Sequence, residues 1–135
     1  MRVLAVDLGS VRIGVAVSDP TGVLASPYEV VRRDGGEYAR LRTIVSETGA
    51  ERVIVGMPLS LDGTRRAAAL AVAAEIDDLR ALLGVDIETW DERFTTVTAH
   101  RGMAAAGKRS KARRQTVDAA AAAVLLQSWL DARDT

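Results

Sequence analysis

Short apolar runs alternate with turn residues over the first quarter of the chain. Residues 3–6 are all apolar, which predicts a strand that is covered on both faces of a sheet. Residues 12–18, RIGVAVS, follow a Gly-Ser turn and predict a second strand that forms a hairpin with the first. A third strand is expected over 23–31, and Pro27 places it at an edge of the sheet because proline cannot donate a ladder hydrogen bond.

The spacing of the apolar residues then changes to a helical period. In 37–48 and in 64–83 they recur every three or four residues, which predicts two helices that each bury one stripe. Gly49 and Gly84 follow directly, where glycine commonly ends a helix in the left-handed conformation.

Each of these helices leads into a short predicted strand, at 52–56 and at 85–90. A helix followed by such a strand is the arrangement that builds parallel pairing. The segment 57–63, MPLSLDG, is expected to be a loop because proline and glycine mark it. The pattern therefore predicts an α/β fold in which three strands precede alternating helices and strands.

The C-terminal third is expected to be helical, with one basic connector. Helices are predicted over 95–106 and 116–132, and the segment 108–115, KRSKARRQ, is expected to be an exposed connector between them. On the last helix, Asp118 lies at helical spacing from Ala122 and Leu125. One acid therefore shares the apolar face of that helix.

Length and composition limit the classes of protein that need to be considered. The 135 residues, of which 48% are hydrophobic and 27% charged, fit one globular domain over 1–135. The absence of cysteine excludes disulfides, thiolate catalysis and cysteine-based zinc sites. No apolar run approaches the roughly 18 residues of a membrane helix, and no signal peptide precedes the first strand. We therefore expect a cytoplasmic protein without a membrane partner.

The net charge is zero, but the charges are unevenly distributed. Residues 93–117 carry seven basic side chains and no acid, whereas the rest of the chain carries 11 basic and 18 acidic ones. Such asymmetry is typical of a protein that meets a polyanion on one side. A solvated loop is the alternative, because no aromatic residues are interleaved to stack bases. The residues expected to contact nucleic acid are Arg12, Lys108, Arg109, Lys111, Arg113 and Arg114.

Acidic residues lie at the ends of two predicted strands and at the start of the last predicted helix. Asp7 ends the first strand, Asp91 and Glu92 end the last one, and Asp118 begins the C-terminal helix. The carboxyl ends of parallel strands meet at one edge of a sheet, where α/β proteins place their sites. Gathered carboxylates need cations, and their hard oxygen ligands suit Mg²⁺ or Mn²⁺. Such ions can activate water and promote in-line displacement at a phosphodiester.

Each acid also has a purely structural explanation. Asp7 could bind turn amides, and Asp118 could favour a helix start through the helix dipole. Asp91 and Glu92 could form a solvated strand end paired with Arg93. Side chains alternate between the two faces of a strand, which places Asp91 on the same face as Val85 and Ile87. This alternation, called strand parity below, by itself favours Asp91 over Glu92 as the acid of the site.

Four segments in order resemble the YqgF/RuvX family. They are VDLGSVRIGVAVSD, GMPLSLDG, WDERFTT and VDAAAAAVLLQSWL, and the resemblance spans essentially the whole chain. The family comprises Holliday-junction-resolvase-like proteins that are also regarded as the nuclease trimming the 5′ end of precursor 16S ribosomal RNA. Each motif alone is weak, because DLG before a glycine hairpin also occurs in sugar kinases and actin-like ATPases.

The resemblance implies an RNase H-like fold, a mixed five-stranded sheet of three antiparallel and then two parallel strands, flanked by helices. It implies a nuclease dependent on Mg²⁺ or Mn²⁺ whose metal-binding acids match Asp7, Glu92 and Asp118. A bulge at the end of the last strand would reconcile Glu92 with strand parity. The supporting residues would be Asp91, Arg93 and Thr95.

The substrate is not distinguished by the residues. We favour precursor ribosomal RNA over a branched DNA junction, whose two cuts would require a symmetric homodimer. A nucleotide-using kinase, suggested by Asp7-Leu8-Gly9, would need two duplicated domains, and a non-catalytic nucleic-acid-binding module would not need the acids. Arg65 and Arg66 oppose the dipole at a predicted helix start and hint at a phosphate contact, whereas His100 is expected at the surface.

Overall fold

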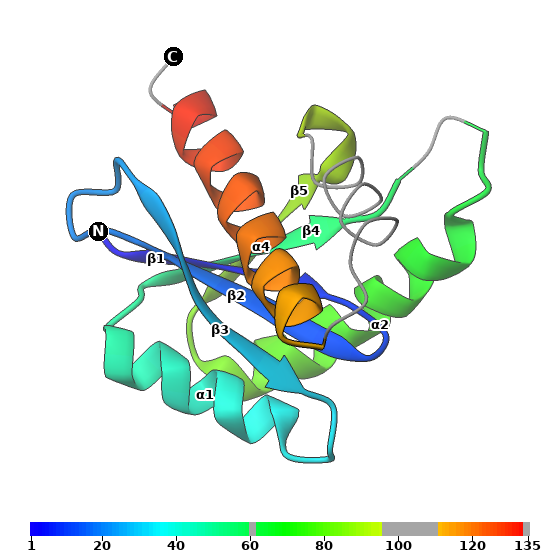
Figure 1. Ribbon diagram of the computed structural model, residues 1–135, viewed down its shortest axis with the longest axis horizontal. Coiled ribbons are helices and arrows are strands. Elements are labelled where there is room, and N and C mark those ends of the chain that lie inside the picture. Colours follow the sequence, from blue (N-terminus) through cyan, green and yellow to red (C-terminus); the bar gives the residue numbers. More distant parts are fainter. Residues whose placement is uncertain (60–61, 96–110, 134–135) are drawn as a thin grey trace.

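Five strands form one mixed sheet in the order β3-β2-β1-β4-β5 (Figure 1). The computed structural model describes residues 1–59, 62–95 and 111–133, with side chains in the last range from Val117 onward. β1, β2 and β3 pair antiparallel, whereas β4 and β5 run parallel to β1. The predicted sheet is therefore confirmed. The strands are β1 (Val3–Leu8), β2 (Arg12–Ser18), β3 (Ala25–Arg32), β4 (Arg52–Met57) and β5 (Asp86–Asp91).

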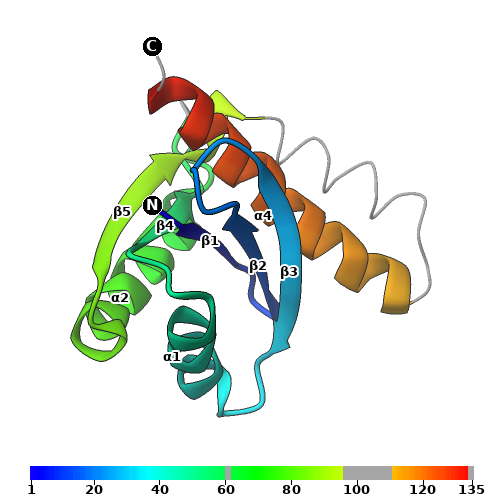
Figure 2. The same cartoon turned by 90° about the vertical axis from the view of Figure 1, so that its left-hand side faces the viewer.

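Helices cover both faces of this sheet. α1 (Glu37–Thr48) and α2 (Arg66–Leu83) lie on one face, and α4 (Lys111–Arg133) lies on the other (Figure 2). Because side chains alternate along a strand, Leu4 and Val6 pack toward α1 and α2, while Val3 and Ala5 pack toward α4. This explains why the start of β1 is apolar without interruption. None of the helices in the described residues combines the length and the apolar character needed to cross a bilayer.

α4 lies close to the sheet because small residues face each other. Ala121 and Ala122 are fully buried, and Gly14 of β2 lies directly beneath the helix. A Cβ added to Gly14 would lie 2.1 Å from the backbone oxygen of Asp118. The absence of a side chain at Gly14 therefore positions the turn of α4 that carries Asp118.

Gly14→Ala is expected to lower the free energy of unfolding by about 1–3 kcal/mol, because the clash is with backbone atoms that can move only together with α4. Urea unfolding of the two proteins measures the difference. Gly36→Ala is the control, since the nearest atom to its Cβ would be an Asp34 carboxylate oxygen at 3.5 Å. Equal effects of both substitutions would contradict this packing.

Several boundaries differ from the sequence-based predictions. α4 begins at Lys111, so the prediction of a connector is wrong for 111–115, whose Lys, Ala, Arg and Gln residues favour helix. α2 begins at Arg66 instead of 64, because residues 62–65 form a turn. β3 is at the edge, as predicted, but runs over Ala25–Arg32.

The end of β5 also differs from expectation. A 3-10 turn, η1 (Glu92–Phe94), follows Asp91 directly, where a strand bulge was expected. Thr95 after it is extended, and the rest of the predicted helix over 95–106, including His100, lies outside the described residues.

Candidate active site

Asp7 lies near the carboxyl end of the central strand β1. Its register partner on β2 is Gly14, and the residue is only 6% exposed. Among the described residues, Asp7 and Glu92 are the two charged residues that are buried. Burying a carboxylate costs several kcal/mol unless charge or hydrogen bonds compensate for it. The amide of Gly9 donates to the backbone carbonyl of Asp7, so this amide does not explain the buried carboxylate.

Glu92 reaches the interior because η1 turns the chain after β5. Its residue is 4% exposed and lies over Gly56 of β4, where an added Cβ would be 3.3 Å from the Glu92 Cγ. The backbone amide and hydroxyl of Thr95 both donate to the Glu92 carbonyl, at 3.1 and 3.0 Å. This turn places Glu92 inward where continued strand geometry would have placed it outward.

Asp91 has a different role from Glu92. Its carboxylate accepts a hydrogen bond from the Arg93 amide at 2.9 Å and pairs with the Arg93 guanidinium at 2.7 Å. The hydrogen bonds from Arg93 hold the pKa of Asp91 below its usual range. Asp91 therefore stabilises the turn that places Glu92 in the interior. The alternation of side chains along the strand favoured Asp91 as the acid of the site, but its carboxylate is paired with Arg93.

Asp118 is located on α4 opposite the start of β2. Arg12 donates from Nε to Asp118 Oδ2 at 2.7 Å, and the two side chains are 21% and 17% exposed. Because α4 begins at Lys111, Asp118 lies about two turns inside the helix. The helix-dipole explanation for Asp118 is therefore wrong, since that effect is confined to the first turn.

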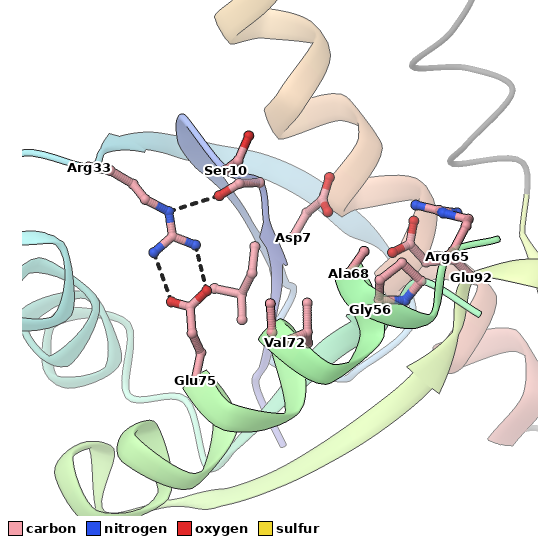
Figure 3. A pocket seen from close by; sticks show the side chains of 13 residues that line it. Asp7, Ser10, Arg33, Gly56, Arg65, Ala68, Val72, Glu75 and Glu92 are labelled. Atoms are coloured by element: carbon pink, nitrogen blue, oxygen red, sulfur yellow. Dashed lines mark hydrogen bonds and ion pairs between the residues drawn. The ribbon is translucent and has the colours of Figure 1, made fainter. Parts of the chain in front are cut away.

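A cavity of about 270 Å³ contains both buried acids (Figure 3). Figure 3 shows Arg33 and Glu75 at one end, Glu92 and Arg65 at the other, and Asp7 between them. The wall comes from β1, β4, α2 and η1, so distant parts of the sequence meet here.

A second hollow of about 210 Å³ lies on the other side of Asp7. Arg12 and Asp118 line it together with the turn of residues 9–11. Asp7 is therefore common to both hollows, sharing one with Glu92 and the other with Asp118.

The described residues do not contain a ready-made metal site. No three His, Cys, Asp or Glu side chains in that part of the chain form a group that could hold an ion. Asp7 shares one hollow with Glu92 and the other with Asp118, but the three acids do not form one cluster. The Asp118 carboxylate is paired with Arg12. Carboxylate oxygens are the ligands that Mg²⁺ and Mn²⁺ prefer. The oxygen donors of Asp7, Glu92 and Asp118 are of the kind that suits such an ion, and the Asp118 carboxylate is paired with Arg12 in this structure.

The basic residues expected to bind nucleic acid are only partly described. Lys108 and Arg109 lie outside the described residues, and the side chains of Lys111, Arg113 and Arg114 are not described. The backbone of the last three forms the first turns of α4, on the same helix as Asp118.

Sequence reasoning missed an ion-pair network at the other end of the large cavity. Arg33 donates to the Gly9 carbonyl at 2.8 Å and to both Glu75 oxygens at 2.7 and 2.8 Å. The Tyr38 hydroxyl donates to Glu75 at 2.7 Å. Glu75 falls at helical spacing within the stripe that includes Val72, and a charge on that stripe was the available signal. The network joins the β1–β2 turn to α2.

The network also shifts the titration of its members. Burial raises the pKa of Glu75, but the hydrogen bonds from Arg33 and Tyr38 outweigh it and lower the pKa below its usual value. Burial and the bond to Glu75 raise the pKa of Tyr38 to about 12. A lowered pKa in the folded state stabilises the fold above the ordinary carboxyl pKa, and this contribution is lost as pH falls through the folded value.

Glu75→Gln is expected to lower the free energy of unfolding by about 2 kcal/mol at pH 7, because Arg33 loses its nearer charge partner at 2.7 Å and keeps only Glu37 at 3.8 Å. The difference should shrink as pH falls from the ordinary carboxyl pKa through the lowered pKa of Glu75, where the carboxylate becomes protonated in the folded wild type. Urea unfolding across this pH range measures both effects. Asp77→Asn, on an exposed position of α2, is the control; a pH-independent loss in Glu75→Gln would contradict the assignment.

Comparison with known proteins gives a consistent result. The family model RuvX, described as Holliday junction resolvase, matches residues 1–132. A protein of Mycolicibacterium paratuberculosis named "Putative pre-16S rRNA nuclease" is 48% identical over 135 residues, covering 98% of this chain and 81% of the relative. A protein of the same name from Kineococcus radiotolerans is 47% identical over 136 residues, covering 98% and 72%.

A solved structure supports the fold. RuvC of Thermus thermophilus in complex with a Holliday junction substrate superposes with a TM-score of 0.62 at 20% identity. The match covers 99% of this chain and 96% of that chain. At this identity the likeness concerns the fold alone, and it confirms the expected RNase H-like arrangement.

Proposed function

This chain belongs to the RuvX family, and we propose that it is a divalent-metal-dependent nuclease that hydrolyses phosphodiester bonds in structured nucleic acid. The observation that carries the proposal is the cavity that buried Asp7 and Glu92 share at the carboxyl ends of the parallel strands. Buried acids that cost stability are expected where they serve chemistry. Its proposed task is 5′-end processing of precursor 16S ribosomal RNA in the cytoplasm. The names of relatives at 47–48% identity, which say pre-16S rRNA nuclease, support this RNA as the substrate.

The metal ligands in this proposal are Asp7, Glu92 and Asp118. A bound Mg²⁺ or Mn²⁺ supplies an activated water and stabilises the negative charge that develops on the phosphate. Asp7 contributes from the centre of the sheet and Glu92 from η1, and their burial keeps bulk water from the ligands. The low dielectric around them strengthens each electrostatic contact.

Arg12 and Asp118 are proposed to exchange partners when substrate binds. In the free protein their ion pair satisfies both charges at 2.7 Å. A phosphate oxygen offers Arg12 an equivalent acceptor, since guanidinium binds carboxylate and phosphate in the same geometry. The exchange would free Asp118 for the metal when the nucleic acid is in place. Basic side chains on the first turns of α4 and before it would hold the backbone of the nucleic acid.

The description of the family as Holliday junction resolvase supports branched DNA as the second candidate substrate. A junction cutter needs two active sites facing opposed strands and hence a symmetric homodimer, whereas trimming one RNA end does not. Incubation of the protein with labelled precursor RNA and with a four-way junction, each with Mg²⁺, Mn²⁺ or chelator, separates the two. We expect metal-dependent shortening of the RNA. Paired cuts in the junction, without shortening of the RNA, would instead identify branched DNA as the substrate.

A further inference from the structure

The turn between β1 and β2, residues 9–11, borders both hollows of the candidate site. Its residues Gly9 and Ser10 line the hollow that contains Glu92 and also the one that contains Asp118. The position of this turn therefore shapes both hollows at once.

Packing of side chains does little to fix the turn. Gly9 has no side chain, Ser10 is exposed, and Val11 is 65% exposed. The backbone closes tightly, since a Cβ added to Gly9 would lie 2.5 Å from the carbonyl oxygen of Arg12. The place of the turn relative to the rest of the fold must therefore depend on hydrogen bonds to its backbone.

Arg33, the residue after β3, donates two such hydrogen bonds. Its backbone amide donates to the Val11 carbonyl at 3.4 Å, and its Nε donates to the Gly9 carbonyl at 2.8 Å. The other two nitrogens of the guanidinium donate to the Glu75 carboxylate at 2.7 and 2.8 Å. A single residue thus ties the turn to α2, at the end of the cavity opposite Glu92 (Figure 3).

We propose that Arg33 is a positioning residue of the active site, which acts by holding the β1–β2 turn beside Asp7. It acts through the carbonyls of Gly9 and Val11 and does not contact the substrate. This inference rests on the proposed nuclease function, because it assigns a role in arranging the same site.

Displacement of the turn would alter the site in two places. Arg12 follows the turn directly and donates to Asp118 at 2.7 Å, so a shift of the turn also moves this ion pair. The Gly9 amide donates to the Asp7 carbonyl at 3.0 Å, so the turn closes against the strand that carries Asp7. Misplacement of reacting groups by about 1 Å can slow a reaction about 100-fold.

A purely structural ion pair would lower stability without affecting the site, and the chain offers a matched example. Arg40 on α1 donates two hydrogen bonds to the Glu29 carboxylate on β3, in the same two-bonded geometry as Arg33 and Glu75. Neither Arg40 nor Glu29 is among the described residues that line the two hollows. Removing both members of either pair leaves the net charge unchanged, which separates positioning from a simple electrostatic effect on a divalent ion.

The first test measures the turn without metal or nucleic acid. The Arg33 variant combines Arg33→Met with Glu75→Gln, and the control variant combines Arg40→Met with Glu29→Gln, each in the full isotope-labelled chain. NMR relaxation should show the order parameters of the turn amides falling from about 0.85 to below about 0.6 in the Arg33 variant and remaining near about 0.85 in the control. The amides of β1 report that both variants are folded.

The second test is single-turnover cleavage of precursor RNA in Mg²⁺. The Arg33 variant is expected to cleave about 100-fold more slowly at saturating RNA. The RNA concentration that gives half the maximal rate should not change, because no substrate contact is lost. The control variant should match the wild type in both quantities.

Turn amides that stay ordered in the Arg33 variant would overturn the inference. An equal loss of rate in the control variant, or a loss confined to the RNA concentration for half-maximal rate, would also overturn it. Absence of cleavage by the wild type would instead contradict the proposed function. The order of the turn would then still decide whether Arg33 holds it, since that measurement needs neither metal nor substrate.

Discussion

Asp7→Asn and Glu92→Gln should each reduce the single-turnover rate of precursor RNA cleavage by about 1,000-fold or more. Both substitutions keep the size of a buried side chain but remove the negative charge that would hold the divalent ion. A loss of this size corresponds to about 4 kcal/mol of transition-state stabilisation. Gel analysis of end-labelled RNA in Mg²⁺ or Mn²⁺ measures it.

The same variants are expected to remain folded, because Asn and Gln match the sizes of the buried Asp7 and Glu92 side chains that they replace. Thermal unfolding in chelator tests this expectation. Asp77→Asn, on the exposed face of α2, should change neither the rate nor the stability. Cleavage that persists in both active-site variants would show that the activity does not depend on Asp7 and Glu92.

Arg12→Gln should raise the affinity for Mn²⁺ about tenfold when no nucleic acid is present. The reason is that Arg12 occupies an oxygen of Asp118 in the free protein, and a hydrogen bond between charged groups contributes about 1.5–3 kcal/mol. Isothermal titration of Mn²⁺ into the purified protein measures the change. The same variant should bind nucleic acid more weakly, since it loses a phosphate contact.

The matched control is the double variant Arg12→Gln, Asp118→Asn. It should bind Mn²⁺ no more tightly than Asp118→Asn alone, because the released carboxylate is the source of the gain. Unchanged or weaker Mn²⁺ binding in Arg12→Gln would mean that the ion pair does not compete with the metal.

The elements predicted best from the sequence are those with local signals. The ranges 12–18 and 37–48 coincide with β2 and α1, because turn residues and glycine mark their ends and one period runs through each. The family resemblance, drawn from four motifs, is confirmed by the match over residues 1–132. Asp7 was prominent because an acid interrupts an otherwise apolar strand.

What the sequence could not provide depended on one local turn and on one contact between distant residues. The choice between Asp91 and Glu92 rested on η1, a turn stabilised by Asp91 and Arg93, which strand parity does not anticipate. The pair of Arg33 and Glu75 joins positions 42 residues apart without a recognisable motif. This contact arises only when the end of β3, which Arg33 follows, lies beside α2.

Anomalous diffraction from crystals grown with Mn²⁺ and a non-hydrolysable nucleic acid would examine the proposed centre directly. We expect a manganese peak bonded to carboxylate oxygens of Asp7, Glu92 and Asp118, with Arg12 turned from Asp118 to a phosphate. A peak held by other residues, or none beside Asp7 at saturating Mn²⁺, would contradict the assignment of these three side chains as the metal ligands of a nuclease.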